Sequence, residues 1–466
     1  MDFAKMLVSM DDFMYTYILI ILLAASGIYF TIRTKAVQVR LFPQALKAVT
    51  EKKSDSGKVS SFQALMVATA SRVGTGNIAG VATAIVTGGP GALMWMWIMA
   101  VIGSASAFIE STLAQVYKEK DGTSFKGGPA YYIQKALKAR WLGIIFAIFL
   151  IATFAFGFNG LQSYNLTSAF QYYVPHFSHT IVPKIIGLLV AAGAGVLFFG
   201  GVDKISKATS IMVPVMAALY ILTGLIIFFM NIDKLPDAMA LVVDDAFDFR
   251  SIVGGFVGSC MTYGIKRGLF SNEAGMGSAP NAAASADVSH PAKQGLVQVL
   301  SVFIDTILIC SCSAFIILLT GKYTVHGSLN GIPLIQQSVA SQFGEAGIHF
   351  ITVAIVLFAF TSLIGNYVYA EFNIKFITDS KVVMVIFRIA ATVMVFVGAQ
   401  VSMDVAWSLA DIIMGFMAIV NLIAIFLLGK KALLVLDDFE RQRKLGRDSH
   451  FRARDVGFED TDLWKD

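Results

Sequence analysis

Long apolar runs, separated by short polar segments, make up most of the chain between Tyr15 and Leu428. Each run has about 18 residues or more, which is the length that a helix needs to cross a hydrocarbon core roughly 30 Å thick. A backbone in lipid has to satisfy its own hydrogen bonds, so each run is predicted to be helical. The eleven predicted spans are residues 15–31, 62–86, 91–117, 141–170, 183–201, 208–230, 251–283, 296–320, 347–376, 382–400 and 404–428.

The composition supports a membrane protein. Hydrophobic residues make up 56% of the chain and charged residues only 14%, and the mean hydropathy is +0.70. A soluble domain carries roughly 25% charged residues, so a soluble enzyme held by one membrane anchor is excluded. We therefore expect an all-α polytopic membrane protein whose surroundings are membrane lipid. The N-terminus lacks the basic segment and cleavage site of a secretory signal, which predicts that the first span is retained.

The positions of the basic residues indicate the topology. When Lys184 and Lys375, which lie at the ends of their spans, are counted with the adjoining segments, the segments after spans 1, 3, 5, 7 and 9 and the C-terminal tail hold 27 of the 36 Lys and Arg residues. The segments on the opposite side hold five. The positive-inside rule then predicts a multi-pass protein of the plasma (inner) membrane, with its N-terminus outside and its C-terminus in the cytoplasm. Because these residues lie in short loops, the net charge of +5 does not indicate a nucleic-acid partner.

Two spans carry polar, glycine-rich interruptions. The second contains RVGTGN at 72–77, and the seventh contains YGIKRGLFSNEAGMGSAP at 263–280. The two spans run in opposite directions, and such a pair of discontinuous helices is typical of an inverted-repeat secondary transporter, although small-residue packing is the alternative. We predict four regions: an N-terminal helix with a basic loop, two five-helix repeats, and a solvated or membrane-surface tail, at residues 1–60, 61–230, 231–428 and 429–466.

A discontinuous helix is able to bind both the carboxylate of an amino acid and a sodium ion. It leaves carbonyls free at the end of its first half and N–H groups free at the start of its second half. The carbonyl end attracts a cation and the N–H end attracts a carboxylate. In span 2 we expect the carbonyls from Ala70 to Val73 to face a cation and the amides of Thr75 and Gly76 to face a carboxylate. The side chain of Asn77 is placed to bridge the two.

Four segments resemble the alanine or glycine:cation symporter family. They are VGTGNIAGVATAIVTGGPGALMWMW (73–97), RGLFSNEAGMGSAPNAAA (267–284), HPAKQGLVQVLSVFIDT (290–306) and WSLADIIMGFMAIVNLIAI (407–425). The resemblance covers essentially the whole hydrophobic chain. It implies one added N-terminal helix plus a ten-helix inverted repeat of the leucine-transporter type. It also implies symport of small neutral amino acids, with sodium as the coupling ion and no organic cofactor.

The resemblance also suggests ligands for sodium. The run FAFTSLIGNYVYAE at 358–371 is similar to the helix whose hydroxyls complete a sodium site in such transporters. Thr361 and Ser362 are therefore implied as ligands, together with the carbonyls of Ala70 and Val73. These oxygen ligands suit a hard cation. The alternative is that the two hydroxyls only bond back to their own helix, as Ser and Thr often do.

The resemblance implies further residues around the substrate. Gln162 looks like the family's substrate-facing glutamine, and Phe270 looks like a wall of the pocket. Ser271 and Asn272, beside it, are implied to expose backbone groups for the amino end of the substrate. One position departs from the pattern: many family members have tryptophan where this chain has Asn366. A tryptophan at this position would limit the pocket to a very small side chain, and asparagine does not set this limit. Serine, glutamine and asparagine are therefore candidate substrates, in addition to alanine and glycine.

Ionisable residues inside the spans are costly, about 2.5 to 3.5 kcal/mol each at mid-helix, so each needs a partner or water. Asp305, near the middle of span 8, is a candidate to hold a cation or the substrate ammonium, and equally to bond to a helix break. Six others are candidates for cytoplasmic-side gate pairs or for snorkelling at the edge of the pathway: Arg72, Glu110, Lys266, Arg267, Glu273 and Glu371. Arg72 has no more specific role from the sequence.

Together these observations favour a secondary active transporter that takes up alanine, glycine or a similar small amino acid with sodium by alternating access. A proton-coupled amino-acid symporter is the alternative. An ion channel is a hypothesis of another class, but channel filters are usually rings of equivalent loops rather than two segments of opposite direction. A membrane-embedded enzyme is disfavoured, since no paired carboxylates, metal-ligand cluster or nucleophile arrangement occurs among the spans.

Overall fold

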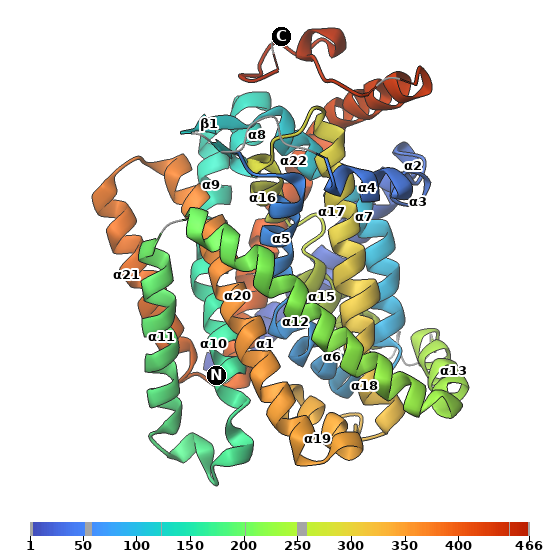
Figure 1. The fold of residues 1–466 in the computed structure, drawn as a ribbon, viewed down its shortest axis with the longest axis vertical. Coiled ribbons are helices and arrows are strands. Elements are labelled where there is room, and N and C mark those ends of the chain that lie inside the picture. Colours follow the sequence, from blue (N-terminus) through green and yellow to red (C-terminus); the bar gives the residue numbers. More distant parts are fainter. Residues whose placement is uncertain are drawn as a thin grey trace.

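The computed structural model describes residues 3–51, 58–122, 124–200, 202–248, 259–446 and 448–464, and the fold is a bundle of long helices (Figure 1). Within these residues, nine helical segments are long and apolar enough to cross a membrane. They are α1 and α2 (Phe3–Met14 and Ile20–Arg33), α7 (Ala92–Val116), α9 and α10 (Arg140–Ile151 and Asn159–Ser168), α11 (Val182–Gly200), α12 (Val202–Met230), α17 and α18 (Pro291–Val302 and Ser311–Thr320), α20 (Glu345–Ile377), α21 (Lys381–Gly398) and α22 (Met403–Lys444).

The two remaining predicted spans are the interrupted ones. Span 2 is divided into α5 (Ser61–Arg72) and α6 (Ala79–Thr83), and span 7 into α15 (Cys260–Asn272) and α16 (Ala279–Ser285). The start predicted for span 7, residues 251–258, lies outside the described residues. In Figure 1 α5 lies above α6, whereas α15 lies below α16, so the two broken helices run in opposite directions as predicted. The count of eleven spans and the repeat boundaries stay predictions.

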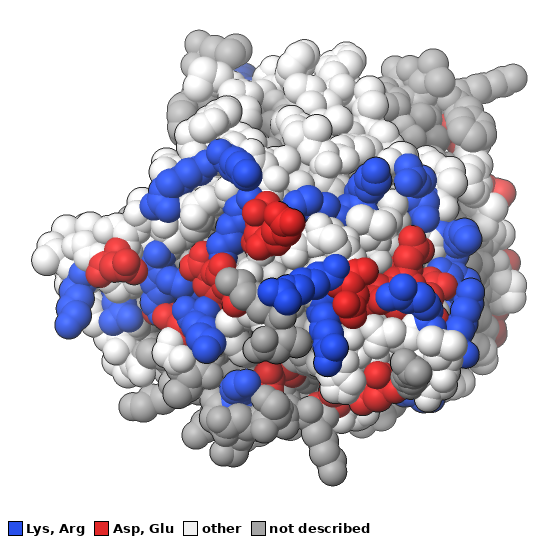
Figure 2. All heavy atoms as spheres, turned by 90° about the horizontal axis from the view of Figure 1, so that it is seen from above, with Lys and Arg blue, Asp and Glu red and all other residues white. Residues whose placement is uncertain are grey.

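Short elements cover the two ends of the bundle. One end carries α3 (Val37–Arg40), α4 (Phe42–Val49), α8 (Pro129–Ala136) and the β1–β2 hairpin (Glu119–Asp121 with Ser124–Lys126). The other end carries α13 (Leu235–Ala246) and α19 (Gly331–Phe343). Figure 2 shows that Lys and Arg gather with Asp and Glu on the end that holds β1 and α8. This is the face predicted to be cytoplasmic, although the orientation in the membrane stays a prediction.

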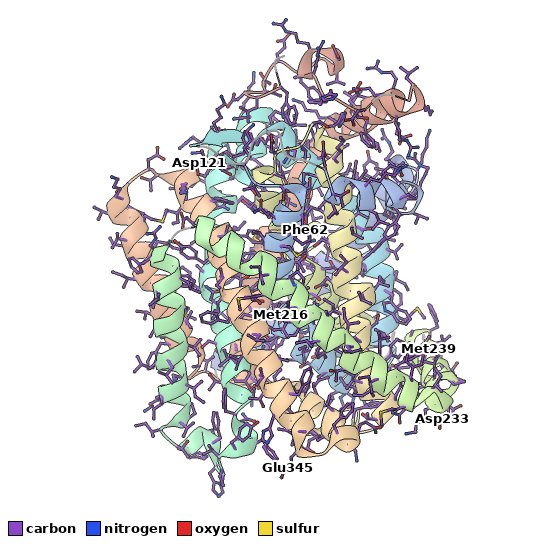
Figure 3. The ribbon with its side chains drawn as sticks, in the orientation of Figure 1. Phe62, Asp121, Met216, Asp233, Met239 and Glu345 are labelled. Carbon is purple, nitrogen blue, oxygen red and sulfur yellow. The ribbon has the colours of Figure 1, made fainter. Side chains whose placement is uncertain are left out.

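Charged and apolar residues are distributed as a membrane protein requires. Asp121 lies at one end of the bundle and Asp233 and Glu345 at the other, while Met216 lies at mid-height on α12 (Figure 3). Along α11, α12 and α21 many large apolar side chains are exposed. An exposed apolar surface of this extent is stable only where hydrocarbon covers it. The structure is therefore consistent with a lipid-facing middle band and polar ends.

The helix at each end of the chain is longer than the apolar run predicted. The first helical segment begins at Phe3 rather than at residue 15, and α22 continues to Lys444 rather than stopping at 428. In both cases charged residues end the hydropathy signal while the helix itself continues. The tail was predicted to be solvated or to lie at the membrane surface. Phe451, Phe458 and Trp464 are buried, and Trp464 Nε1 donates to the carbonyl of Gln115 at 2.9 Å, so the aromatic residues of the tail pack on the bundle.

Candidate functional site

The break in span 2 begins where α5 ends at Arg72. A capping box of Ser60 and Gln63 starts this helix, and its last turn is followed by Val73, whose φ and ψ of −80° and 85° are not helical. The N–H of Gly74 then donates to Asn77 Oδ1 at 3.0 Å, inside a short 3-10 turn. The predicted interruption is confirmed. Asn77 fixes the turn as well as facing the neighbouring elements.

The break in span 7 depends on left-handed backbone. Glu273 has a φ of +55° at the end of α15, and Gly275 and Gly277 follow with φ of +80° and +88°. A non-glycine residue is strained at such angles, which explains the glycine-dense sequence here. The two breaks meet directly, because Asn77 Nδ2 donates to Ser271 Oγ at 2.9 Å. The structure therefore brings together both polar clusters that the sequence singled out.

The N–H end of the first break faces α10. Thr75 donates through its backbone N–H and its hydroxyl to Gln162 Oε1, at 3.2 and 2.8 Å, and Asn165 Nδ2 donates to Thr75 Oγ1 at 2.8 Å. Gln162 thus lies beside the amides expected to bind a carboxylate. Its side-chain carbonyl oxygen accepts a hydrogen bond from the Thr75 N–H, which was predicted to bind a carboxylate. Asn165 was missed, although its spacing of three from Gln162 places both on one helix face.

Two glycines allow other elements to approach the break. A Cβ on Gly74 would lie 2.3 Å from Ser362 Oγ, and a Cβ on Gly76 would lie 2.3 Å from Cε1 of Phe270. Neither separation is possible for real atoms, so only glycine fits at these positions without a shift. The ring of Phe270 packs in turn on Phe158, with centroids 4.6 Å apart, and on Trp407, with centroids 5.0 Å apart. The predicted wall is therefore part of a cluster of three aromatic residues beside the break.

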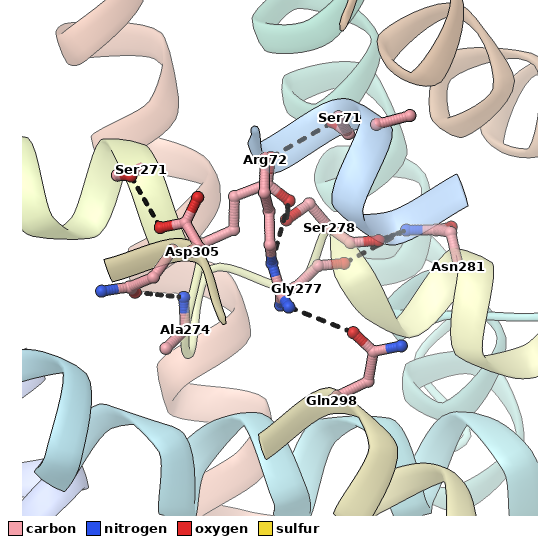
Figure 4. A network of polar contacts seen from close by, with 12 residues as sticks. Ser71, Arg72, Ser271, Ala274, Gly277, Ser278, Asn281, Gln298 and Asp305 are labelled. Carbon is pink, nitrogen blue, oxygen red and sulfur yellow. Dashed lines mark hydrogen bonds and ion pairs between the residues drawn. The ribbon is translucent and has the colours of Figure 1, made fainter. Parts of the chain in front are cut away.

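The carboxylate of Asp305 joins the two breaks. It is fully buried and accepts hydrogen bonds from Asn77 Nδ2 at 2.6 Å, from Ser271 Oγ at 2.6 Å and from Thr306 Oγ1 at 2.9 Å. Figure 4 shows the contact between Ser271 and Asp305. All three donors are neutral, so within the described residues no basic side chain forms an ion pair with Asp305. A buried carboxylate without a paired charge favours a bound cation or a proton.

Around the carbonyl end of the first break, α20 packs closely on α5. Gly365 lies against Ser71, where a Cβ would meet the backbone nitrogen at 2.7 Å. Ser362 Oγ donates to the carbonyl of Ala70 at 3.1 Å. Thr361 instead donates back to its own helix, to the carbonyls of Leu357 and Phe358 at 3.0 Å each. Of the two hydroxyls implied as sodium ligands, the structure therefore brings one to the break. Val73, the last residue of this group, is buried at the end of α5.

Two of the implied substrate residues are engaged elsewhere. The side chain of Asn272 donates to Thr306 at 3.2 Å and accepts from the N–H of Ala274 at 3.0 Å, which closes the end of α15. Asn366 accepts from Ser71 Oγ at 2.8 Å and donates to Asn159 Oδ1 at 3.1 Å. Both side chains support the breaks from outside the cluster of Thr75, Gln162 and Phe270. Their direct contact with substrate stays a prediction.

Arg72 lies between the two breaks. Its Nη1 donates to Gln298 Oε1 at 3.2 Å, and its Nε lies 4.0 Å from Glu273 Oε2 (Figure 4). Glu273 also accepts from Ser71 and Ser278, which come from the two broken helices. The guanidinium is buried, so it supplies a positive charge that compensates the buried Glu273. Arg72 therefore connects the end of α5 to the loop between α15 and α16.

A second buried carboxylate holds the same loop. Glu110 on α7 accepts from the backbone N–H groups of Gly275 and Gly277, at 3.3 and 3.1 Å, and from Asn421 Nδ2 at 2.7 Å. The backbone N–H groups left free by the break in span 7 are thus bound by a protein carboxylate. This makes the second break less available to a substrate carboxylate than the first, where Gly76 and Thr75 face Gln162 and the aromatic residues.

Lys266 and Arg267 lie where the sequence did not place them. They were candidates for cytoplasmic-side gate pairs, but they pair with Asp11, near the end of α1, and with Asp411, near the start of α22. On the predicted topology this is the extracellular half of the bundle. The physical reason is that α15 is, on this predicted topology, the outer half of its broken span, so both bases lie next to the outer parts of α1 and α22. Glu371, near the end of α20 that is predicted to be cytoplasmic, pairs with other residues, namely Lys375 and Arg388 at 3.3 and 3.6 Å.

Comparison with known proteins gives one consistent result. The model of the sodium:alanine symporter family matches residues 1–453. The amino-acid carrier protein AlsT and the probable sodium/glutamine symporter GlnT, both of Bacillus subtilis (strain 168), are each 46% identical, over 98% and 95% of this chain and 96% and 91% of the relatives. The sodium/alanine symporter AgcS of Methanococcus maripaludis is 37% identical over 95% of this chain and 99% of its own.

A solved structure, that of MhsT in complex with L-phenylalanine, has a similar fold. It superimposes with a TM-score of 0.62 over 83% of this chain and 93% of that chain, at 14% identity. This identity is too low to transfer a binding residue, so the similarity concerns the fold alone. It agrees with the leucine-transporter type of fold that the family resemblance implies.

Proposed function

The chain belongs to the sodium:alanine symporter family of membrane transporters, and we propose that it carries a small neutral amino acid into the cell together with sodium. The observation that carries this proposal is the meeting of two broken helices at Asn77 and Ser271. Such a meeting point offers free backbone groups of both signs in the middle of the bundle. It is the arrangement that a zwitterion and a cation need in order to bind next to each other.

The proposed carboxylate site consists of the backbone N–H groups of Thr75 and Gly76. The Thr75 N–H now donates to Gln162 Oε1. A substrate carboxylate would replace this neutral acceptor with a charged one, and charge-assisted hydrogen bonds are roughly twice as strong. Gln162 would then rotate to present its amide nitrogen to the substrate. Gly74 supports this, because a Cβ there would lie 3.0 Å from Gln162 Nε2.

The proposed cation positions lie on either side of the same break. One is formed by the carbonyls of Ala70 and Val73 with Ser362 and, after rotation of its hydroxyl, Thr361. The support for it is the contact of 3.1 Å between Ser362 Oγ and the carbonyl oxygen of Ala70. Both carbonyl and hydroxyl oxygens suit sodium, which is a hard cation.

The second proposed cation position is beside the carboxylate of Asp305. This carboxylate is buried, and its oxygens lie within 2.9 Å of Asn77, Ser271 and Thr306. The three neighbours carry oxygen atoms that a cation could share with Asp305. A bound sodium ion would provide the positive charge that this carboxylate lacks. A proton on Asp305 is the competing occupant, and it corresponds to the proton-coupled alternative.

The aromatic cluster suggests a small substrate. Phe270 lies against Gly76, and Phe158 and Trp407 lie against Phe270, so there is little room for a large side chain next to the proposed carboxylate site. Alanine and glycine fit this restriction best. Serine and glutamine are further candidates. GlnT, which is as similar to this chain as AlsT is, is named a probable sodium/glutamine symporter. In addition, this chain has Asn366 where many family members have tryptophan.

Transport would proceed by alternating access around this site. The two proposed repeats, residues 61–230 and 231–428, would rock against each other and expose the break first to the outside and then to the cytoplasm. The N-terminus would be outside and the C-terminus in the cytoplasm of a plasma-membrane protein. Sodium and amino acid would raise each other's affinity by the same factor, because coupling between two binding sites is reciprocal.

Uptake of labelled alanine into proteoliposomes tests the proposal. A sodium gradient should drive accumulation, and the same vesicles with equal sodium on both sides, or with a proton gradient alone, should not accumulate alanine. Accumulation driven by the proton gradient alone would replace sodium with a proton. Current without amino acid in the same vesicles would favour the ion channel. A competition panel of glycine, serine, glutamine and their D forms then identifies the preferred substrate.

A further inference from the structure

A cluster of four buried charges lies on the outer side of the broken helices. The Lys266 ammonium contacts the carboxylate of Asp11 and lies 3.4 Å from Asp411 Oδ2. Arg267 Nη2 donates to the same Asp411 oxygen at 2.7 Å. All four residues are buried, each 4% exposed or less. The cluster is neutral in sum, since two bases face two acids.

The cluster is connected to the proposed substrate site by a continuous stack of side chains. The guanidinium of Arg267 lies 4.0 Å from the ring centroid of Trp407, which packs on Phe270. Phe270 lies against Gly76, which is in the first break. A Cβ on Gly80 of α6 would also meet Trp407 at 3.3 Å. Arg267 is therefore in contact with the aromatic residues that lie beside the proposed substrate site.

Three different parts of the fold supply the four charges. Lys266 and Arg267 belong to α15, and Asp411 belongs to α22. Both of these helices lie within the proposed second repeat, residues 231–428, except for the end of α22. Asp11 belongs to α1, which packs on α22 and lies in the N-terminal region outside both repeats. The added N-terminal helix thus contributes one of two acids to the charge cluster. Without Asp11, the single carboxylate of Asp411 would face two buried cations.

We propose that Asp11, on the added N-terminal helix, positions the outer gate, which consists of the Arg267–Asp411 pair together with Trp407 and Phe270. Asp11 binds Lys266, and this leaves Asp411 for Arg267, whose guanidinium holds Trp407 and Phe270 over the substrate. Opening to the outside separates α15 from α22 and breaks the pair of Arg267 and Asp411. During this movement Asp11 remains the partner of Lys266, so that no lone ammonium is left in the bundle. Asp11 is a positioning residue. The proposal rests on alternating access at the site described above.

The test compares Asp11→Asn with a matched control in the full-length protein. The control is Asp12→Asn, because Asp12 is next on the same helix, is only partly buried, and makes no direct ion pair within the described part of the chain, so that its charge acts on Lys266 only from a greater distance than that of Asp11. Removing one partner of a buried pair is far more costly than removing both. We therefore expect sodium-driven alanine uptake to fall about tenfold in Asp11→Asn, to stay near wild type in Asp12→Asn, and to recover largely in the double variant Asp11→Asn with Lys266→Gln.

Amide hydrogen exchange distinguishes a role of Asp11 in the gate from a role in only holding α1 in place. With sodium and alanine present, wild-type amides of residues 260–272 should exchange slowly, and in Asp11→Asn they should exchange several times faster and lose their response to alanine. Faster exchange confined to residues 3–33, with uptake unchanged, would overturn the proposal, as would equal behaviour of the Asp11 and Asp12 variants. If wild-type uptake itself does not require sodium, the proposed function fails instead, and that result does not depend on Asp11.

Discussion

The ring of Phe270 lies directly against the α-carbon of Gly76, so closely that a Cβ on Gly76 would come within 2.3 Å of Cε1 of the ring. The two residues belong to the two different broken helices. Their contact sets the width of the space next to the N–H groups of the first break. It also links any movement of α15 to the position where we propose the substrate carboxylate binds.

Replacement of Gly76 by valine should abolish substrate binding while the protein still inserts and folds. The side chain would have to displace Phe270, which is held by Phe158 and Trp407. We expect alanine affinity to fall at least about a hundredfold, which corresponds to about 2.7 kcal/mol. Equilibrium binding of labelled alanine to purified protein measures this. The matched control is Gly200→Val, since nothing lies within 4 Å of a Cβ at that position. Retained affinity in the Gly76 variant would place the carboxylate elsewhere.

Loss of the Ser362 hydroxyl should weaken sodium binding. Its oxygen is 3.1 Å from the carbonyl oxygen of Ala70, so it is already at the end of α5 where the cation is proposed. Ser362→Ala should raise the sodium concentration for half-maximal uptake about tenfold, or about 1.4 kcal/mol. Thr361→Ala should raise it less, because that hydroxyl has to turn away from its own helix first.

A hydroxyl elsewhere provides the control for this pair. Thr392 on α21 donates to the carbonyl of Arg388 at 2.8 Å, as a hydroxyl bonded only to its own helix does. Thr392→Ala should leave the sodium dependence of uptake unchanged. If Ser362→Ala behaves like Thr392→Ala, the sodium ion does not use this helix, and the position beside Asp305 becomes the better candidate for it.

Neutralising Asp305 should change the number of cations that accompany one amino acid. Asp305→Asn keeps the size of the side chain but removes its charge, so a cation held there is lost. We expect the ratio of sodium to alanine, measured from reversal potentials in proteoliposomes, to fall by one. If the ratio stays unchanged while the dependence of uptake on external pH between 5.5 and 8 disappears, Asp305 carries a proton rather than sodium.

The sequence predicted the helices well because the membrane imposes a simple physical rule. A run of apolar residues long enough to cross the bilayer has to be helical, and local residues decide this. The two interruptions were also predictable, since glycines at 74 and 76 and at 275 and 277 weaken a helix locally. Helix ends outside the membrane were not, because there tertiary packing replaces hydropathy as the deciding factor. The extension of α22 to Lys444 is an example.

The candidate site could be predicted only in part, for a related reason. Thr75 and Asn77 were found because they lie within the break itself, and Gln162 because of resemblance. Trp407 lies in a segment that resembles the family, but the sequence did not indicate its role. Its contact with Phe270 joins positions that are far apart in the sequence. The partnership of Asp11 with Lys266 was missed for the same reason. Contacts of this kind depend on how whole helices pack, which no local pattern encodes.

The stability of the end of the bundle that carries β1 and α8 should depend on pH through Lys118. Burial is the main cause that lowers the pKa of Lys118 from 10.5 to about 7; the charge of Asp287 opposes this shift and the charge of Lys58 adds to it. The ammonium donates to the carbonyl of Ala286 and lies over the ring of Trp464, 5.1 Å from its centroid. In the unfolded chain Lys118 binds a proton up to about pH 10.5, whereas in the folded chain it releases the proton near pH 7.

The unfolded state therefore binds more protons above pH 7, so the free energy of unfolding should rise with pH there, by at most about 1.4 kcal/mol per pH unit. Lys118→Met keeps the apolar stem but does not titrate. Relative to this variant, the thermal midpoint of the wild-type protein in detergent should increase from pH 6.5 to pH 9. Lys120→Met, at an exposed neighbouring position, should retain the wild-type pH dependence. A constant difference in midpoint between wild type and Lys118→Met across this range would mean that Lys118 keeps its proton in the folded protein.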